Sequence, residues 1–266
     1  ITSIEGEHLD KLGPGLADVA AHKAGILKPC VPCIVGPQDD AAMAVIERRA
    51  AQIGAPLLVH GQHWHVSVER DRLIYQDETG LLDLPLPNLP GPHQIQNAGA
   101  ALATLRYLGR GDSDAAVTQA FWPARMQRLT KGALVQDLDL PEVWLDGGHN
   151  PAAGRAIADT LATQRGRDTH IVCGMINTKD VAGFLAPIAP HCTSLTAITI
   201  PDEPNAVPAQ DIVLAAKSCG INAMVGTSVD SALKNFAQVY PQARVLICGS
   251  LYLAGHVLRE NALSDD

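Results

Sequence analysis

Apolar runs recur through the second half of the chain, and a helical pattern follows each of them. The runs are continuous rather than alternating, at 143–145, 171–173, 195–200, 223–225 and 245–248. Amphipathic stretches follow near 152–165, 180–189, 208–219, 229–239 and 251–260. Strands that read as continuous apolar runs between helices are typical of a parallel sheet covered on both faces. The sequence therefore predicts an α/β, doubly wound domain in this half.

The first half has a more mixed pattern. It predicts helices at 16–27, 41–53 and 95–108, and short strands at 31–35, 57–59, 64–68 and 73–75. The last two strands form a hairpin around Arg70 and Asp71, and a proline-rich extended stretch follows at 84–92. Because a polar break at 111–114 separates the two patterns, we expect domains at 1–115 and 116–266.

Composition narrows the class of protein. The 266 residues are 47% apolar, which supports two modest cores, and the net charge of −8 argues against a nucleic-acid partner. The sequence contains no run of 18 apolar residues, so it predicts no membrane-spanning helix. We expect a cytoplasmic, monomeric enzyme that acts on small molecules. The six cysteines are expected to be reduced, and the C-x-x-C at Cys30–Cys33 to be structural, because no second such pair completes a zinc site.

The sharpest local motif is the segment Asp146–Pro151, which follows an apolar strand. Its two glycines precede Asn150, a good helix N-cap, and Pro151, a good first helical residue. Backbone N–H groups at such a strand-to-helix junction often face an anion, and ligands of open α/β sheets bind at this edge. Asp146 can either accept hydrogen bonds from a ribose or be satisfied within its own turn.

Lys23 and His8 are the candidate catalytic residues of the opening stretch. Lys23 shares a predicted helix face with apolar residues, so it is either snorkelling or buried as a neutral amine. A neutral amine can take up CO2 and become a carbamate, which is a carboxylate-like metal ligand. His8 follows an acidic residue in a loop and can ligate a divalent ion or be simply solvated.

Arg125 and Asn97 are candidate nucleotide ligands. Arg125 follows the predicted domain boundary, where a guanidinium can bind phosphate bidentately, although a surface ion pair is the more common role. The amide of Asn97, in the first turn of an apolar helix, can read a base edge or cap the helix. The sequence contains no G-x-x-x-x-G-K-[ST] phosphate-binding loop.

Several segments, taken in order, resemble the folylpolyglutamate synthase/dihydrofolate synthase family of the Mur ligase superfamily. Each segment is short, and together they span nearly the whole chain. They are Ile1–Ile4 with Glu7 and His8, Lys23–Ile26 with Lys28 and Pro29, Leu89–Gly91 with His93, Gln94 and Asn97, Trp122 with Arg125–Leu129, Leu145–Pro151, Lys179 with Asp180, and Cys248–Tyr252.

The resemblance implies the C-terminal part of a Mur-ligase-type P-loop ATPase domain, followed by a Rossmann-like α/β domain with a mostly parallel sheet. It implies an ATP-dependent ligase that adds L-glutamate to dihydropteroate or folate through an acyl phosphate. His8 and Lys23, carbamylated, would be magnesium ligands. Asn97, Arg125 and Asp146 would bind ATP, with His149 in the same cleft.

Two departures from the family pattern shape these expectations. The phosphate-binding loop and most of the pterin pocket of the family lie upstream of Ile1, so we expect this chain alone to lack activity. His22 stands where the family often has an acidic residue. A peptidoglycan-precursor ligase and a non-catalytic nucleotide-binding module are the alternative functions.

Overall fold

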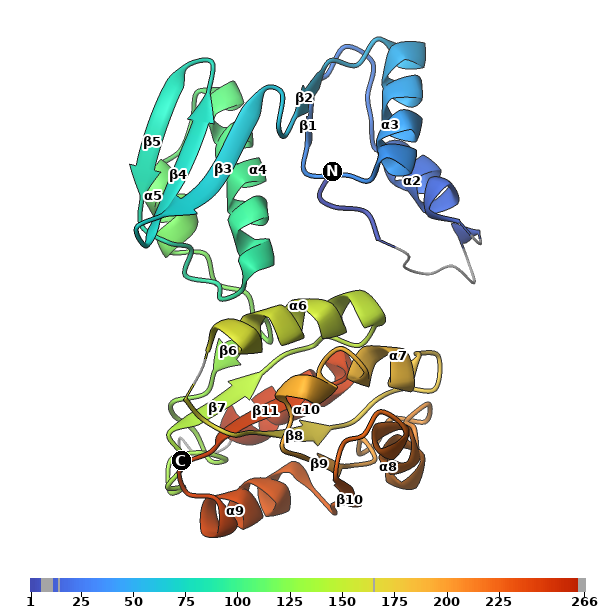
Figure 1. Ribbon diagram of the computed structural model, residues 1–266, viewed down its shortest axis with the longest axis vertical. Helices are drawn as coiled ribbons and strands as arrows, with labels where there is room; N and C mark the ends of the chain where they lie inside the picture. Colours follow the sequence, from blue (N-terminus) through green and yellow to red (C-terminus); the bar gives the residue numbers. More distant parts are fainter. Residues whose placement is uncertain (6–11, 14, 165, 263–266) are drawn as a thin grey trace. The chain divides into compact units, whose positions relative to one another are not determined.

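The computed structural model describes residues 1–5, 12–13, 15–164 and 166–262 (Figure 1). The chain divides into two units, Ile1–Phe121 and Trp122–Asp266. Each unit has its own buried apolar clusters, so each is described by itself.

The first unit begins with two helices beside a small parallel sheet. The order along the chain is α2 (Leu16–Ala24), β1 (Cys33–Val35), α3 (Asp40–Ile53) and β2 (Leu57–Val59), so α3 connects the two parallel strands. α3 ends at Gly54, whose φ of 67° is the left-handed conformation that glycine adopts without strain. Buried side chains of α2, α3 and β1, among them Val19, Ile46 and Val35, form one apolar cluster.

The rest of the first unit is an antiparallel sheet packed on a long helix. β3 (Trp64–Glu69), β4 (Arg72–Asp77) and β5 (Gly80–Leu84) pair in that order, and α4 (Pro92–Leu108) and α5 (Ser113–Thr118) follow. α4 approaches the sheet so closely that a Cβ at Gly99 would lie 2.6 Å from Val66 and 2.7 Å from Trp64. The glycine is therefore required by the contact between helix and sheet.

The second unit is a six-stranded sheet with the strand order β10-β9-β8-β11-β7-β6. All neighbours are parallel except β6 and β7, which pair in antiparallel fashion. The strands are β6 (Gln127–Arg128), β7 (Glu142–Leu145), β8 (Thr169–Cys173), β9 (Ser194–Ala197), β10 (Ala223–Val225) and β11 (Arg244–Cys248). The predicted mostly parallel α/β fold is confirmed.

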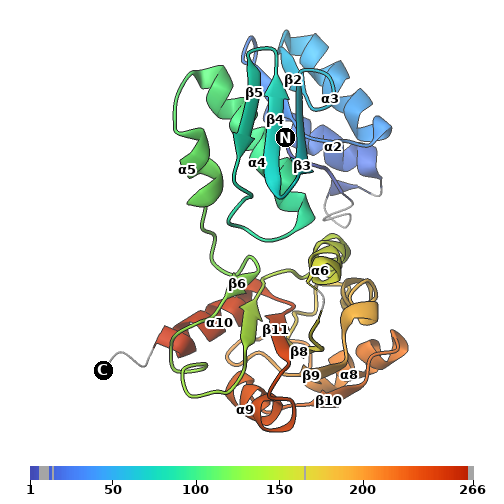
Figure 2. The ribbon, with the colours of Figure 1, turned by 60° about the vertical axis from the view of Figure 1, so that its left-hand side comes forward.

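Helices cover both faces of this sheet (Figure 2). Alternate residues of the central strands face opposite sides: Ile171 and Leu246 join a cluster with α6, α7 and α8, whereas Val172 and Ile247 join a cluster with α9 and α10. The period of two residues in a strand thus explains why both faces are apolar. The helices are α6 (Pro151–Thr163), α7 (Val181–Leu185), α8 (Ala209–Ser218), α9 (Val229–Val239) and α10 (Leu251–Ala262), with a 3-10 turn at Ala189–His191.

The structure corrects several sequence-based boundaries. The stretch predicted as merely extended at 84–92 is preceded by strand β5, and the polar break at 111–114 runs into α5. The first helix ends at Ala24 rather than at residue 27, and the strand predicted at 195–200 ends at Ala197. The last two errors lie at element ends, where boundaries are least determined by local sequence, whereas β5 and α5 were missed as whole elements.

Two further expectations can be checked in the described residues. None of the helices in this part of the chain is both long and apolar enough to cross a membrane. All six cysteines are free thiols, as predicted, and the C-x-x-C pair lies at the surface, with Cys30 exposed and Cys33 half-buried.

Candidate active-site residues

Asp146 lies at the carboxyl end of β7, inside a closely packed junction of loops. Its side chain is only 4% exposed. The carboxylate accepts two backbone hydrogen bonds, from the Met126 N–H at 2.8 Å and from the Gly148 N–H at 2.7 Å. Of the two sequence-based interpretations, the structure of this unit supports local satisfaction: both oxygens already have a donor.

Burial raises the pKa of Asp146, because the charged carboxylate loses hydration. The hydrogen bonds from Met126 and Gly148, and the nearby Arg125 and His149 side chains, lower this pKa and oppose the effect of burial. The carboxyl group therefore joins the loop that carries Arg125 to the loop that carries His149.

Arg125 projects from a tight turn that precedes β6. Its neighbours Ala124 and Met126 are buried, at 7% and 2% exposure, whereas Arg125 itself is exposed. The turn is fixed from both sides, since the Gly147 N–H donates to the Ala124 carbonyl at 2.8 Å and Met126 donates to Asp146. The guanidinium is thus presented to solvent from a rigid base.

His149 is half-buried beside the N-terminus of α6. Its Nδ1 lies 2.9 Å from the Gly147 carbonyl oxygen. A carbonyl oxygen only accepts, so Nδ1 carries the proton, and Nε2 of the neutral ring is the atom left to contact a ligand. Asn150 caps α6 as predicted, because its Oδ1 accepts from the Ala153 N–H at 2.7 Å.

The neighbouring strand end packs against the same loop. The Gly249 N–H, after β11, donates to the Gly148 carbonyl at 3.0 Å. A Cβ at Gly249 would lie 2.8 Å from the Gly174 carbonyl, which follows β8. The carboxyl ends of β7, β11 and β8 therefore meet at one edge of the sheet, where ligands of such folds bind.

Lys23 lies in the last turn of α2 in the first unit, and its side chain is exposed. Of the two interpretations, burial as a neutral amine is wrong, because the side chain is exposed. Two apolar residues of the predicted face, Val19 and Ala20, are buried. An exposed amine is accessible to CO2.

Asn97 lies in the second turn of α4 rather than the first, because the helix begins at Pro92. Its side chain is exposed, and its Nδ2 donates to Oε1 of Gln94 at 3.0 Å. Gln94 is buried, so it fixes the rotamer of Asn97 on the helix surface.

His8, the other predicted metal ligand, lies outside the described residues. Within residues 1–5, 12–13, 15–164 and 166–262, no three His, Cys, Asp or Glu side chains form a group that could hold a metal ion. The described residues thus contain Lys23, Asn97, Arg125, Asp146 and His149, the last three within a single loop junction.

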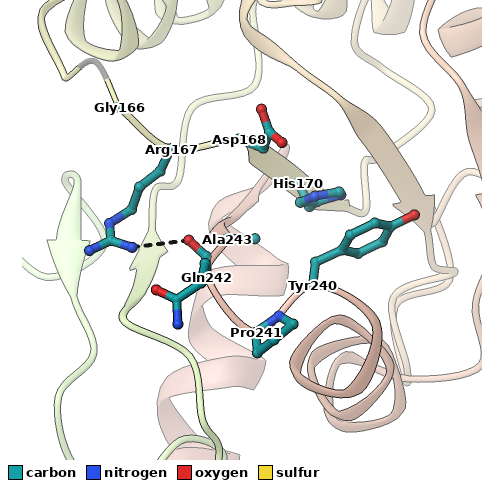
Figure 3. Close-up of a pocket in the computed structure, with 8 residues that line it drawn as sticks. All are labelled: Gly166, Arg167, Asp168, His170, Tyr240, Pro241, Gln242 and Ala243. Carbon is teal, nitrogen blue, oxygen red and sulfur yellow. Dashed lines mark hydrogen bonds between the residues drawn. The ribbon is translucent and has the colours of Figure 1, made fainter.

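A pocket of about 540 Å³ lies away from these residues, at the amino ends of β8 and β11 (Figure 3). Arg167, Asp168, His170 and Tyr240 line it, and Arg167 donates to the Gln242 carbonyl at 3.0 Å. None of the predicted site residues contributes to its lining. It therefore gives no support to the predicted site.

The second unit is similar to a known class of domain. Residues 124–251 match the model described as "Mur ligase, glutamate ligase domain". The matched segment begins at the Arg125 turn and ends at the start of α10, so it includes the whole loop junction described above.

The chain as a whole is a relative of the folylpolyglutamate synthase/dihydrofolate synthase family, as the sequence predicted. It is 30% identical over 270 residues to the dihydrofolate synthase/folylpolyglutamate synthase of Escherichia coli (strain K12). It is 25% identical over 275 residues to the folylpolyglutamate synthase of Lacticaseibacillus casei. Each match covers 97% of this chain, but only 58% and 60% of the relative, so the chain spans less than two thirds of their length.

Solved structures of the family share the fold. A structure of Escherichia coli FolC in complex with DHPP and ADP aligns with a TM-score of 0.83 at 28% identity, over 97% of this chain and 59% of the other. A Yersinia pestis bifunctional folylpolyglutamate synthase/dihydrofolate synthase with Mn, AMPPNP and L-glutamate bound aligns with a TM-score of 0.79 at 27% identity, over 97% and 60%. The family is one of ATP-dependent carboxylate–amine ligases.

Proposed function

We propose that this chain contributes to the ATP-dependent ligation of L-glutamate to dihydropteroate, to folates or to both, through an acyl phosphate. The observation that carries the proposal is the match to folate synthases over 97% of the chain, together with the retained loop junction. The proposed location of this reaction is the cytoplasm, where ATP is available. The folate relatives favour this function over a peptidoglycan-precursor ligase and over a non-catalytic module.

Candidate nucleotide ligands occur in each unit and are considered one by one. Arg125 offers an exposed guanidinium whose paired N–H groups match two phosphate oxygens. Nε2 of His149 can contact the ligand, since Nδ1 is engaged with Gly147. Asn97 offers an exposed amide held by Gln94. Within the second unit, Arg125 fits an anionic ligand, and Asp146 fixes the loops on both sides of it by accepting from the Met126 and Gly148 N–H groups.

Magnesium would neutralise charge on the phosphates, and Lys23, once carbamylated, would offer it an oxygen ligand. Oxygen ligands suit this hard cation. The described residues do not form a metal site by themselves, because no group of three ligands occurs among them. The magnesium proposal therefore rests on the resemblance, with His8 as the second expected ligand, and no reaction step is derived from it.

Glutamate incorporation by the complete protein tests the proposed function. Purified protein is supplied with ATP, labelled L-glutamate and either dihydropteroate or a reduced folate, and the product is separated by chromatography. Incorporation with at least one pterin is expected. Incorporation with neither, while ATP is hydrolysed in the presence of a peptidoglycan precursor, would support the Mur alternative instead.

Lys23→Ala tests the carbamate. Turnover by the complete protein is expected to be lost, with the melting temperature unchanged, because the side chain is exposed. Lys28→Ala, at a second exposed lysine of the same segment, is the matched control and should keep full activity. A wild-type rate of glutamate incorporation by Lys23→Ala would contradict the assignment of Lys23 as the carbamylated lysine. In wild-type protein under ¹³CO2, a carbamate resonance that is lost in Lys23→Ala would support it.

The 266-residue chain by itself is expected to incorporate no glutamate, because its sequence contains no phosphate-binding loop of the G-x-x-x-x-G-K-[ST] type. The same assay, applied to the isolated chain, checks this expectation. ATP-dependent product formation would contradict it.

A further inference from the structure

The backbone on both sides of Arg125 adopts a conformation that side chains rarely tolerate. Ala124 has a φ of 54° and Met126 a φ of 40°, so two non-glycine residues in the left-handed region flank a single exposed arginine. Such residues are uncommon, and they persist only where the surrounding structure fixes them. The conformational preferences of alanine and methionine therefore do not explain the turn. We infer that its hydrogen bonds hold it in this conformation.

Gln127 provides the hydrogen bond nearest to the start of the turn. Its Oε1 accepts from the Ala124 N–H at 2.9 Å. Gln127 is the first residue of β6, where it pairs with Leu145 of β7. The amide oxygen is thus tied to the six-stranded sheet, and through it the position of Ala124 is tied to the sheet as well.

The remaining bonds close the turn from the opposite loop. Gly147 donates to the Ala124 carbonyl at 2.8 Å, and the Met126 N–H donates to Asp146. Both polar backbone groups of Ala124 therefore have fixed partners. Arg125 is the only residue of the three whose side chain is exposed.

We propose that Gln127 is a positioning residue, which locks the Ala124–Met126 turn so that the Arg125 guanidinium meets a phosphoryl group of the ligand in one orientation. The inference rests on the proposed phosphate-binding role of Arg125. Arginine has many rotamers, and fixing its backbone reduces the ordering that ligand binding must impose. Without the Gln127 oxygen, the strained turn relaxes toward more common backbone conformations and Arg125 samples several directions.

A double-mutant cycle in the complete protein tests this role. Gln127→Met removes the acceptor and keeps the side-chain length, and it is expected to lower kcat/KM for ATP by about five- to tenfold, the loss typical of one hydrogen bond. Arg125→Ala is expected to lower it further. In the Arg125→Ala background, Gln127→Met should have no added effect, since it acts only through Arg125.

Two outcomes contradict the proposal in different ways. If Arg125→Ala lowers activity but Gln127→Met is fully additive with it, the positioning role is wrong while the role of Arg125 stands. If Arg125→Ala has no effect, the proposed phosphate contact is wrong, and the positioning role is wrong with it. Gln136→Met, at an exposed glutamine of the same unit, is the matched control and should leave the kinetics unchanged.

Ala124→Gly separates positioning from stability. Glycine adopts a φ of 54° without strain, so adding Ala124→Gly to Gln127→Met should restore the melting temperature and also rescue any folding defect of the single variant. It should leave kcat/KM for ATP low, because the glycine turn is free to move. Recovery of kcat/KM together with the melting temperature would show a purely structural role and overturn the proposal.

Discussion

Replacing Asp146 by alanine removes the acceptors of two buried backbone N–H groups. The Met126 and Gly148 amides, bonded at 2.8 and 2.7 Å, would both lose their partners inside a junction where Asp146 is 4% exposed. Each unsatisfied buried donor costs about 1–3 kcal/mol, and removing a buried charge offsets part of this. We expect the free energy of unfolding of the second unit to fall by ~2–4 kcal/mol. Asp146→Asn keeps one acceptor oxygen and should cost ~1–2 kcal/mol.

Hydrogen exchange measures this effect at the amides concerned. In the alanine variant, the Met126 and Gly148 amides should lose protection while those of the central strand β8 retain it, and the melting temperature of this unit should fall by roughly 5–15 °C. Wild-type protection at both amides, or a loss of less than about 0.5 kcal/mol, would refute the reasoning. Thr227→Ala, at a surface hydroxyl of the same unit that bonds only to Ser231, is a control for general destabilisation.

The pH dependence of the free energy of unfolding is a second test of the environment of Asp146. Burial raises its pKa in the folded state, so its contribution to stability is fully present below the unfolded-state pKa of about 3.9 and is lost as the pH rises through the folded-state pKa. The stability of Asp146→Asn should lack this decrease. A variant whose stability falls with rising pH as the wild type's does would show that another group titrates.

Three further predictions concern residues outside the loop junction. Burial lowers the pKa of His170, so the free energy of unfolding should fall as the pH drops below about 6.5. Urea titrations between about pH 7.5 and 5.5 should show a weaker pH dependence for His170→Phe than for the wild type. An equal pH dependence in both proteins would show that His170 does not cause the fall. Gly99→Ala should destabilise the first unit by about 1–3 kcal/mol, because its Cβ would lie 2.7 Å from Trp64; an unchanged denaturation midpoint would contradict the close contact. Asn261→Ala should cost about 1–2 kcal/mol by thermal unfolding, since its Nδ2 donates to the Lys131 carbonyl at 2.8 Å, and an unaltered melting temperature would make that bond dispensable.

The strongest sequence signals concerned the second unit. Continuous apolar runs predicted β7, β8, β10 and β11. The physical reason is clearest for β8 and β11, which are buried at every position and so need apolar side chains on both faces. The helix start at Pro151 was equally predictable, since the Asn150 cap acts within a few residues. Strand β5 and helix α5 were missed although their partners are close in sequence. β5 forms a hairpin with β4, in which Gly80 lies opposite Asp77, and the Asp112 side chain caps α5.

For the candidate site, the residues could be chosen from the sequence, but their surroundings could not. The sequence placed Lys23 on a helix face with apolar residues, but only the structure shows that its side chain is exposed. Nothing in the sequence predicted a role for Gln127. Its Oε1 accepts from the Ala124 N–H only because the chain turns between these two residues. The left-handed φ of Ala124 and Met126 could not be predicted either, because neither residue type favours that conformation.

By itself, the sequence determined the α/β class, the strand–helix alternation and the family resemblance, because periodicity, caps and short motifs are local. Only the tertiary structure decided that Asp146 is engaged by two backbone amides and that the turn before β6 is locked around Arg125. The bond between Met126 and Asp146 joins residues 20 positions apart, and its geometry follows from how β6 and β7 pair in one sheet. Contacts of this kind have no periodic signature along the chain.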